Sequence, residues 1–326
     1  MHALRRLLRT PSSRLGFVLL SLFLFVAFTA PWLAPPIKKC PNIGYYLIPD
    51  WILRPILGSL PCEPYKMPRD GFRVVPLPPD RQAWATFPPQ CCKTQHPLGT
   101  TENRYDIWYG LVWGTRTSLF AGLTIVGLTF LFGLMLGTIS GYFGGWVDGV
   151  LMRLVDFVYV FPGFLAILVF ISIVGPGLDR IIFVSIVLGW AFYARFARGE
   201  VLSLRSREFI DASRAVGANP MRIIVRHVIP NMVYPLLILA SLDIGSIVLG
   251  LAGLSFVGLG SGEDYADWGA MLALARNRIL GSVGGNAFEF WYTIVFPGMA
   301  IFLFVLAWNL VGNAVRDAFD PRLSPN

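Results

Sequence analysis

Few side chains in this sequence are of the types that carry out catalysis, and their spacing argues against an enzyme. The histidines are His2, His96 and His227, and they lack the HExxH spacing of a zinc protease. The sequence contains no GxSxG nucleophile elbow and no GxxxxGK[ST] phosphate loop, and Gly258-Leu-Gly-Ser-Gly262 follows an apolar run instead of joining a strand to a helix. We therefore expect no catalytic residue, no metal and no cofactor in this chain. Without a nucleotide site of its own, any energy that its function requires must be supplied by a partner protein.

The four cysteines fall within one proline-rich stretch. Cys40, Cys62, Cys91 and Cys92 are candidates for disulfides in an oxidising compartment. A bond between adjacent Cys91 and Cys92 would close a strained ring. Because the four cysteines share one predicted exported loop, we predict at least one disulfide that joins Cys40 or Cys62 to Cys91 or Cys92. A zinc site is the alternative, although the spacings lack a CxxC pair and His96 is the one nearby imidazole.

Asp243 is the one carboxylate deep inside a predicted membrane crossing, since Asp156 lies near the start of another. An acid within a membrane is a functional candidate by default, so Asp243 is a candidate for a translocation path. The alternative is that it faces a wet half-cavity or bonds a neighbouring helix without touching substrate. We favour this alternative, because nothing else in the sequence fixes which side of the helix faces a path.

The composition is that of an integral membrane protein. Of the 326 residues, 55% are hydrophobic and 14% are charged, and the mean hydropathy is +0.61. The net charge of +8 does not indicate a nucleic-acid partner, because the basic residues lie mostly beside apolar segments. Their placement instead fits orientation in a lipid bilayer, whose cytosolic side is enriched in Lys and Arg.

Six apolar stretches are long enough to cross a hydrocarbon core of about 30 Å. The first is too long for the apolar region of a signal peptide, so we predict an uncleaved helix. In the second, Gly133, Gly137 and Gly141 repeat at the four-residue spacing of close helix contacts. The predicted crossings are residues 15–34, 117–143, 151–174 with a break at 161–163, 181–194, 231–260 and 290–315, with an interfacial helix at 268–278. The fourth is completed by Arg195 and Arg198, which we expect to reach out to the membrane interface.

The charge pattern orients these crossings. Arginines before the first crossing and within residues 200–230 place both in the cytosol by the positive-inside rule. Six crossings then leave both termini cytosolic. The predicted organisation is a cytosolic N-terminus at 1–14, an exported Pro- and Cys-rich loop at 35–115, a core domain with five crossings at 116–314, and a cytosolic tail at 315–326.

Residues 200–230 form the one long polar segment on the cytosolic side. Ala212, Ala215 and Val216 are three and four residues apart, so a helix from about Glu208 carries a face of small residues on which another backbone can approach closely. Gly217 is placed to end this helix in a left-handed turn. Asn219-Pro220 then reads as the N-cap and first residue of a second helix that runs into Pro230.

This segment resembles the "EAA" loop of the membrane subunits of ABC importers, the loop that docks on the cytosolic ATPase. Asp211, Ala212 and Ser213 fill the Glu-Ala-Ala positions, Gly217 the glycine, and Ile229-Pro230 the closing Leu-Pro. His227 replaces a general Ile, as is typical of the dipeptide, oligopeptide and nickel branch. The resemblance implies an ATPase-coupling role for Glu208, Asp211, Ala212, Ser213, Ala215, Gly217 and Pro230.

Further motifs resemble the C-type permease of dipeptide and oligopeptide importers, in the same order. The run His96-Pro-Leu-Gly-Thr-Thr-Glu-Asn-Arg-Tyr-Asp106 is similar to HPLGTD…GRD, with Thr101 in place of the Asp. Later matches are Trp268-Gly-Ala-Met-Leu, Phe296-Pro-Gly-Met-Ala-Ile, Trp308-Asn-Leu-Val-Gly and Arg316-Asp-Ala-Phe-Asp-Pro-Arg. The resemblance is close over 96–326, loose over 1–34 and absent over 36–95, which reads as an insertion.

The resemblance implies an all-α membrane subunit of ABC importer type I permease architecture, with a cytosolic coupling helix between helices 4 and 5. It implies that this chain lies in the cytoplasmic (inner) membrane. Its implied partners are a second homologous permease in a heterodimer, two ABC ATPases that bind ATP-Mg, and an extracytoplasmic peptide-binding protein. The implied substrates are short peptides. Nickel or another small solute is the alternative. A proton-coupled secondary transporter is the less favoured alternative. It would need ionisable groups in several crossings and a repeat between its halves, whereas this sequence has one deep acid and no such repeat.

Overall fold

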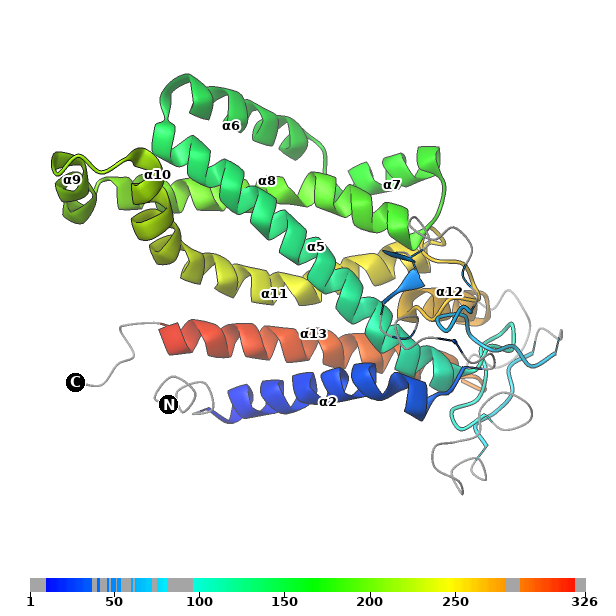
Figure 1. Cartoon of the computed structure of the whole chain (residues 1–326). Coiled ribbons are helices and arrows are strands. Elements are labelled where there is room, and N and C mark those ends of the chain that lie inside the picture. Colours follow the sequence, from blue (N-terminus) through cyan, green and yellow to red (C-terminus); the bar gives the residue numbers. More distant parts are fainter. Residues whose placement is uncertain are drawn as a thin grey trace.

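The computed structural model is a helical bundle in which the long helices run roughly alongside one another (Figure 1). It describes residues 10–36, 40–41, 46, 48–50, 52–53, 60, 62–71, 75–80, 96–279 and 288–319. Within these ranges the β-type pairings are isolated bridges, such as Lys66 with Tyr265. The helices are α2 (Pro11–Leu33), α5 (Ile107–Phe143), α6 (Gly145–Val160), α7 (Gly163–Val174), α8 (Leu178–Arg205), α9 (Glu208–Ala215), α10 (Pro220–Ile223), the π-helical turn η2 (Ile224–Val228), α11 (Ile229–Phe256), α12 (Trp268–Ile279) and α13 (Tyr292–Phe319).

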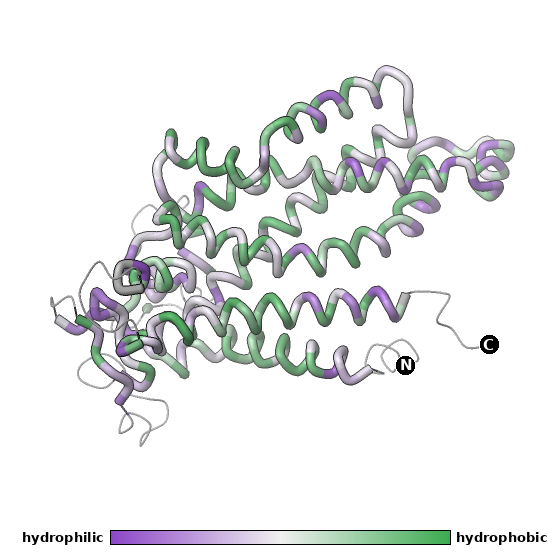
Figure 2. Tube along the Cα trace, turned by 180° about the vertical axis from the view of Figure 1, so that it is seen from behind, coloured by the Kyte–Doolittle hydropathy of each residue, from purple (hydrophilic) through white to green (hydrophobic). Residues whose placement is uncertain are grey.

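Five helical segments of the described chain are long and apolar enough to cross a membrane alone, and the α6–α7 pair makes a sixth. The two helices of this pair meet at an angle of 78°. The break lies at Pro162, the N-cap of α7, because proline cannot donate the backbone hydrogen bond that would continue α6. Apolar residues dominate the middle of the bundle and polar residues gather towards its two ends, as Figure 2 shows. The predicted six crossings, and the break in the third, are therefore confirmed.

Helix α5 begins ten residues before the predicted start of the second crossing. Asp106 caps it by accepting a hydrogen bond from the backbone N–H of Tyr109 at 2.8 Å. Arg116 directly precedes the charge-free run of residues 117–143, yet its side chain is 2% exposed and its guanidinium lies 5.5 Å from the Trp113 ring centroid. Because the bundle accepts this cation, residues 107–115, which were assigned to the exported loop, are helical.

The glycine stripe of α5 lies against α8, as its spacing predicted. Gly133, Gly137 and Gly141 face Tyr193, Ala194, Ala197 and Val201, and the Cβ of an alanine at position 141 would lie only 2.9 Å from the Cβ of Val201. Backbones approach this closely only where side chains are absent. The stripe thus sets the contact between the two central helices.

Helices α2 and α13 lie side by side, although they are far apart in the sequence (Figures 1 and 2). Phe23 of α2 packs edge-on against Phe304 of α13, with ring centroids 5.2 Å apart. The start of α2 and the end of α13 lie at the same end of the bundle as α9, and α12 lies at the other end. Helix α13 continues past the predicted limit at residue 315, so part of the predicted tail is helical.

The predicted second helix of residues 200–230 and the predicted crossing that begins at residue 231 are continuous across Pro230. Helix α10 passes into η2 and then α11, and the run from Pro220 to Phe256 forms one span. Pro230 has no N–H for the carbonyl four residues earlier, and the five-residue spacing of a π-turn is a known way to accommodate such a loss. The proline therefore marks an irregular turn inside a continuous helix.

The cysteine prediction was wrong in its pairing. Cys40 and Cys62 form a disulfide with each other, with their Cα atoms 5.5 Å apart. Neither is available to Cys91 or Cys92, which lie outside the described residues, as does His2. A bridge requires Cα atoms within about 7 Å, and sequence spacing does not report how an irregular loop folds back. The zinc alternative loses two ligands to this bond, and no cluster of three metal-binding side chains occurs in the described ranges.

Candidate functional site

Helix α9 projects from one end of the bundle and is held there by a single buried side chain (Figure 1). Ile210 is fully buried, together with Ile223, Val228 and Met232, against Leu134 of α5 and Val201 of α8. Glu208 and Asp211 occupy the first turn, where the helix dipole favours negative charge. Arg214 forms an ion pair with Asp211 at 3.2 Å. The predicted start at Glu208 is confirmed.

The opposite face of α9 is unoccupied within the described chain. Ala212 and Ala215 are exposed, and Val216 is 88% exposed. Phe209 and Met221 add apolar surface nearby, at 42% and 66% exposure. This patch lies at a polar end of the bundle, away from its apolar middle (Figure 2), so contact with lipid tails does not explain it. The structure brings together the small residues that the helical spacing predicted.

The turn after α9 has the predicted geometry. Gly217 has a φ of 79°, in the left-handed region, and nothing lies within 4 Å of the position of its missing Cβ. The backbone conformation, not crowding, therefore demands glycine. Asn219 caps α10 by accepting from the N–H of Met221 at 3.1 Å, with Pro220 at the start of that helix. Ser213 is half-buried and donates to the Phe209 carbonyl at 2.8 Å, whereas Pro230 is exposed near the start of α11.

Two ion pairs that the sequence reasoning missed connect α6 to α8. Arg198 donates to both carboxylate oxygens of Asp148, at 2.5 and 2.6 Å, and Arg195 donates to Asp156 at 2.6 Å. Both arginines therefore pair with carboxylates of a neighbouring helix instead of only reaching out to the membrane interface. The sequence did place two acids, Asp148 and Asp156, near the start of one predicted crossing and two arginines near the end of the next. These pairs link the bent span to the helix that leads into α9.

Asp243 bonds a neighbouring helix. Its carboxylate accepts a hydrogen bond from the Tyr193 hydroxyl of α8 at 2.9 Å, and Tyr193 is 1% exposed. Asp243 itself is only partly buried. This bond agrees with the interpretation that we favoured, and it ties α11 to α8 midway along both helices.

At the opposite end, His96 joins two segments of the chain. Its Nδ1 lies 2.7 Å from Asp106, the cap of α5, and its Nε2 lies 3.4 Å from Asp70. Burial lowers the pKa of the imidazole, but the hydrogen bonds and charges of these two carboxylates outweigh burial, so the net pKa of His96 is raised. The group fits a structural clasp better than a metal site, given that no metal-binding cluster occurs among the described residues.

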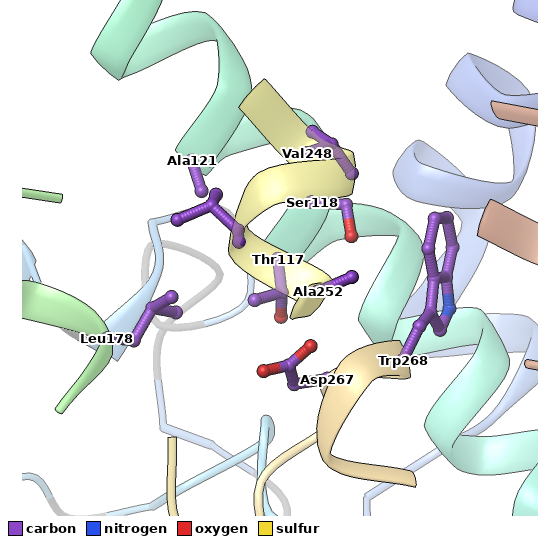
Figure 3. A pocket seen from close by; sticks show the side chains of 9 residues that line it. Thr117, Ser118, Ala121, Leu178, Val248, Ala252, Asp267 and Trp268 are labelled. Atoms are coloured by element: carbon purple, nitrogen blue, oxygen red, sulfur yellow. The ribbon is translucent and has the colours of Figure 1, made fainter. Parts of the chain in front are cut away.

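Helix α12 forms as predicted but is buried in the bundle instead of lying loosely at an interface. Trp268 is 1% exposed and donates to the Leu111 carbonyl of α5 at 3.2 Å. Before it, Asp267 accepts from Ser255 at 2.5 Å and Ser261 at 3.0 Å, and burial raises the pKa of its carboxyl group. Figure 3 shows Asp267 and Thr117 at a cavity of about 10 Å³, room for one water molecule.

Comparison with known proteins identifies the family. Residues 133–325 match the model of the binding-protein-dependent transport system inner membrane component. The chain is 35% identical to the dipeptide transport system permease protein DppC of Alkalihalophilus pseudofirmus over 70% of this chain and 73% of that protein. It is 36% identical to the glutathione permease GsiD of Pectobacterium atrosepticum over 70% and 73%, and 38% identical to the nickel permease NikC of Escherichia coli over 74% and 88%.

These relatives are permease subunits of ABC importers, which leaves the secondary-transporter alternative without support. Membership implies an ATPase, a substrate-binding protein and a place in the inner membrane, in agreement with the spans of the described chain. Family match, identity and helical architecture agree: the chain belongs to the family of binding-protein-dependent transport system inner membrane components, as a membrane-spanning permease subunit of an ABC importer.

Proposed function

We propose that this chain forms one half of the membrane pore of an importer for short peptides. Its partners are a second homologous permease in a heterodimer, two ATPase subunits that bind ATP-Mg, and an extracytoplasmic peptide-binding protein. The main support for an ATPase contact is the exposed face of Ala212, Ala215 and Val216, which no other part of the described chain covers. Peptide relatives such as the dipeptide and glutathione permeases support the substrate class.

In this proposal α9 acts as a rigid docking element. A groove on the ATPase receives the small residues of α9, while Ile210 holds the helix to the bundle from the other side. A push on α9 passes through α10 and η2 into α11, because these elements form one continuous run. The Tyr193–Asp243 hydrogen bond carries the movement on to α8. Asp243 thus works in the pore as a helix link, without binding substrate.

The proposal places α9 and both termini in the cytosol. The start of α2, the end of α13 and α9 share one end of the bundle, and the arginines of residues 200–230 favour that side as cytosolic. Single cysteines at Arg205 and at Asp264, in a background without the four native cysteines, test the orientation with a maleimide that does not cross membranes. We expect labelling of intact cells at position 264 only. Labelling at position 205 from outside would reverse the topology.

Ala212→Trp tests the docking role. We expect the indole to clash with the ATPase groove, so that the variant reaches the membrane at normal levels but loses ATPase association and uptake of a labelled dipeptide. Leu202→Trp, which adds the same ring at an exposed position of α8, is the matched control and should behave as the unmodified chain. Normal ATPase association and uptake by Ala212→Trp would remove the coupling role.

Nickel import is the second candidate, because the nickel permease of Escherichia coli is 38% identical to this chain. Reconstitution with the partner permease, the ATPases and the binding protein separates the two substrates. ATP-dependent uptake of radiolabelled dialanine, with no uptake of nickel, is the expected result. Nickel uptake alone, or peptide uptake driven by a proton gradient without the ATPases, would contradict the proposed function.

A further inference from the structure

A large cavity opens at the end of the bundle that carries α12. Its volume is about 490 Å³, within the range of roughly 300 to 1,000 Å³ that is typical of small-molecule sites. Four segments surround it: residues 102–103 before α5, the turn between α7 and α8, the end of α11 with the glycine-rich turn after it, and α12. No residue of α9 or of the coupling turn contributes to it.

The walls of this cavity are held in place by contacts between lining residues and by contacts with residues behind them. The backbone N–H of Gly177 donates to the Leu259 carbonyl at 3.4 Å, which ties the α7–α8 turn to the end of α11. Gly260 packs so closely on Ser255 that a Cβ would lie 2.6 Å from the Cβ of that serine. Ser255 in turn donates to the buried carboxylate of Asp267 at 2.5 Å. A side chain could not be added to this wall without moving it.

Both signs of charge line the cavity. Glu102 is buried, and Glu263 is exposed with its carboxylate accepting from the Asn103 amide at 2.8 Å. Arg276 of α12 is an exposed cation on the same cavity. Phe256 and Leu274 contribute apolar surface between these charges. Two carboxylates, one guanidinium and an apolar patch together complement a small molecule that has an ammonium group, a carboxylate and a modest side chain.

We propose that this cavity is an entry site for a short peptide, where Glu102 and Glu263 bind the free amino terminus and Arg276 binds the carboxylate terminus. The inference rests on the proposed peptide function and adds a site to it. A divalent metal fits this cavity poorly, because the described residues contain no group of three side chains that could hold one. A simple anion fits poorly as well, because two carboxylates face one arginine. Arginine suits a carboxylate terminus because its planar fork binds both oxygens.

Photo-crosslinking tests the site without the binding protein. The chain is purified with its partner permease and ATPases in lipid nanodiscs and irradiated with alanyl-p-benzoylphenylalanine, in the free-acid form and as the C-terminal amide. We expect labelling within residues 255–276, with competition by unlabelled dialanine. Arg276→Glu should reduce labelling by the free acid about tenfold, as expected for the loss of a charged hydrogen bond, and should change labelling by the amide little.

Two further variants separate the charge effect from damage to the fold. Arg276→Lys should keep most of the labelling by the free acid, because it keeps the charge. Arg69→Glu, at an exposed arginine over the Tyr105 ring and outside the cavity, should label as the unmodified chain does. Labelling only elsewhere, no labelling, failure of dialanine to compete, or equal losses for acid and amide would overturn the site. Dipeptide uptake measured in parallel separates this outcome from failure of the peptide function itself.

Discussion

Two short helices outside the spans, α9 and α12, lie at opposite ends of the bundle and differ in how they bury their apolar side chains. Helix α12 buries Trp268, Met271 and Ala275 against the bundle. Helix α9 buries Ile210 and leaves the face with Ala212 and Ala215 open. Helix α12 thus packs large apolar side chains within the chain, whereas α9 keeps a face with apolar side chains free. This difference indicates where a partner adds to the structure and where the chain supplies its own contacts.

Truncation of Trp268 should produce the largest loss of stability. Trp268→Ala removes a buried indole that packs against Phe304, with ring centroids 5.7 Å apart, and donates to the Leu111 carbonyl. We expect a loss of about 3 to 5 kcal/mol in the free energy of unfolding, measured by chemical denaturation in detergent. Met221→Ala, beside α9 and 66% exposed, is the control and should cost less than about 0.5 kcal/mol. Equal losses would remove the contrast between the two ends.

The Cys40–Cys62 disulfide tests whether the end of the bundle opposite α9 is stabilised from within the chain. The Cys40→Ser and Cys62→Ser double variant removes a disulfide that closes a loop with a sequence separation of 22. In the chain-entropy model, this disulfide contributes about 3 kcal/mol to the free energy of unfolding. We expect a lower midpoint of thermal unfolding in the double variant, and we expect a reductant to lower the midpoint of the unmodified chain but not that of the variant. Peptide mapping of unreduced protein that joins Cys40 to Cys91 or Cys92 would contradict the pairing.

Two glycines sharpen the comparison, because each is required for a different reason. A Cβ at Gly269 of α12 would lie 2.6 Å from the Cα of Ala252, so Gly269→Ala overpacks the contact and should cost about 1 to 3 kcal/mol. Gly217 has open space around it but a left-handed φ, so Gly217→Val should strain the backbone by about 1 to 3 kcal/mol. Gly217→Val should also lose ATPase association, measured by copurification. Gly269→Ala should keep that association in folded protein. The reverse pattern would contradict our assignment of the docking end.

The smallest expected effect is a pH dependence of stability at the end of the bundle opposite α9. The raised pKa of His96 means that the folded chain holds its proton more tightly than the unfolded chain. This contribution to stability is fully present below the unfolded pKa and is lost as pH rises through the folded pKa. Asp106 and Asp70 contact His96, and Arg104 lies 4.0 Å from Asp70. We expect the free energy of unfolding to fall as pH rises above about 6.5, the usual pKa of histidine, and His96→Gln to flatten this fall. If His96→Gln had the same pH dependence as the unmodified chain, groups other than His96 would cause that dependence.

Local rules in the sequence were sufficient for several features. The apolar runs predicted the spans, Pro162 predicted the break between α6 and α7, and Asn219-Pro220 predicted the start of α10. Gly217 predicted the left-handed turn. Each of these depends on the backbone chemistry of one residue or on a short period along the chain, and both are fully visible in the order of the amino acids.

Only the tertiary structure decided the features that depend on distant partners. Arg116 directly precedes the charge-free run in the sequence, but the bundle buries it beside Trp113 and so extends α5. Cys40 pairs with Cys62, Arg198 with Asp148, and Tyr193 with Asp243. Glu263 and Arg276 meet at a cavity that four separate segments enclose. A residue's type limits which bonds it can form, but the path of the whole chain decides which partners come within bonding distance, and so which of those bonds exist.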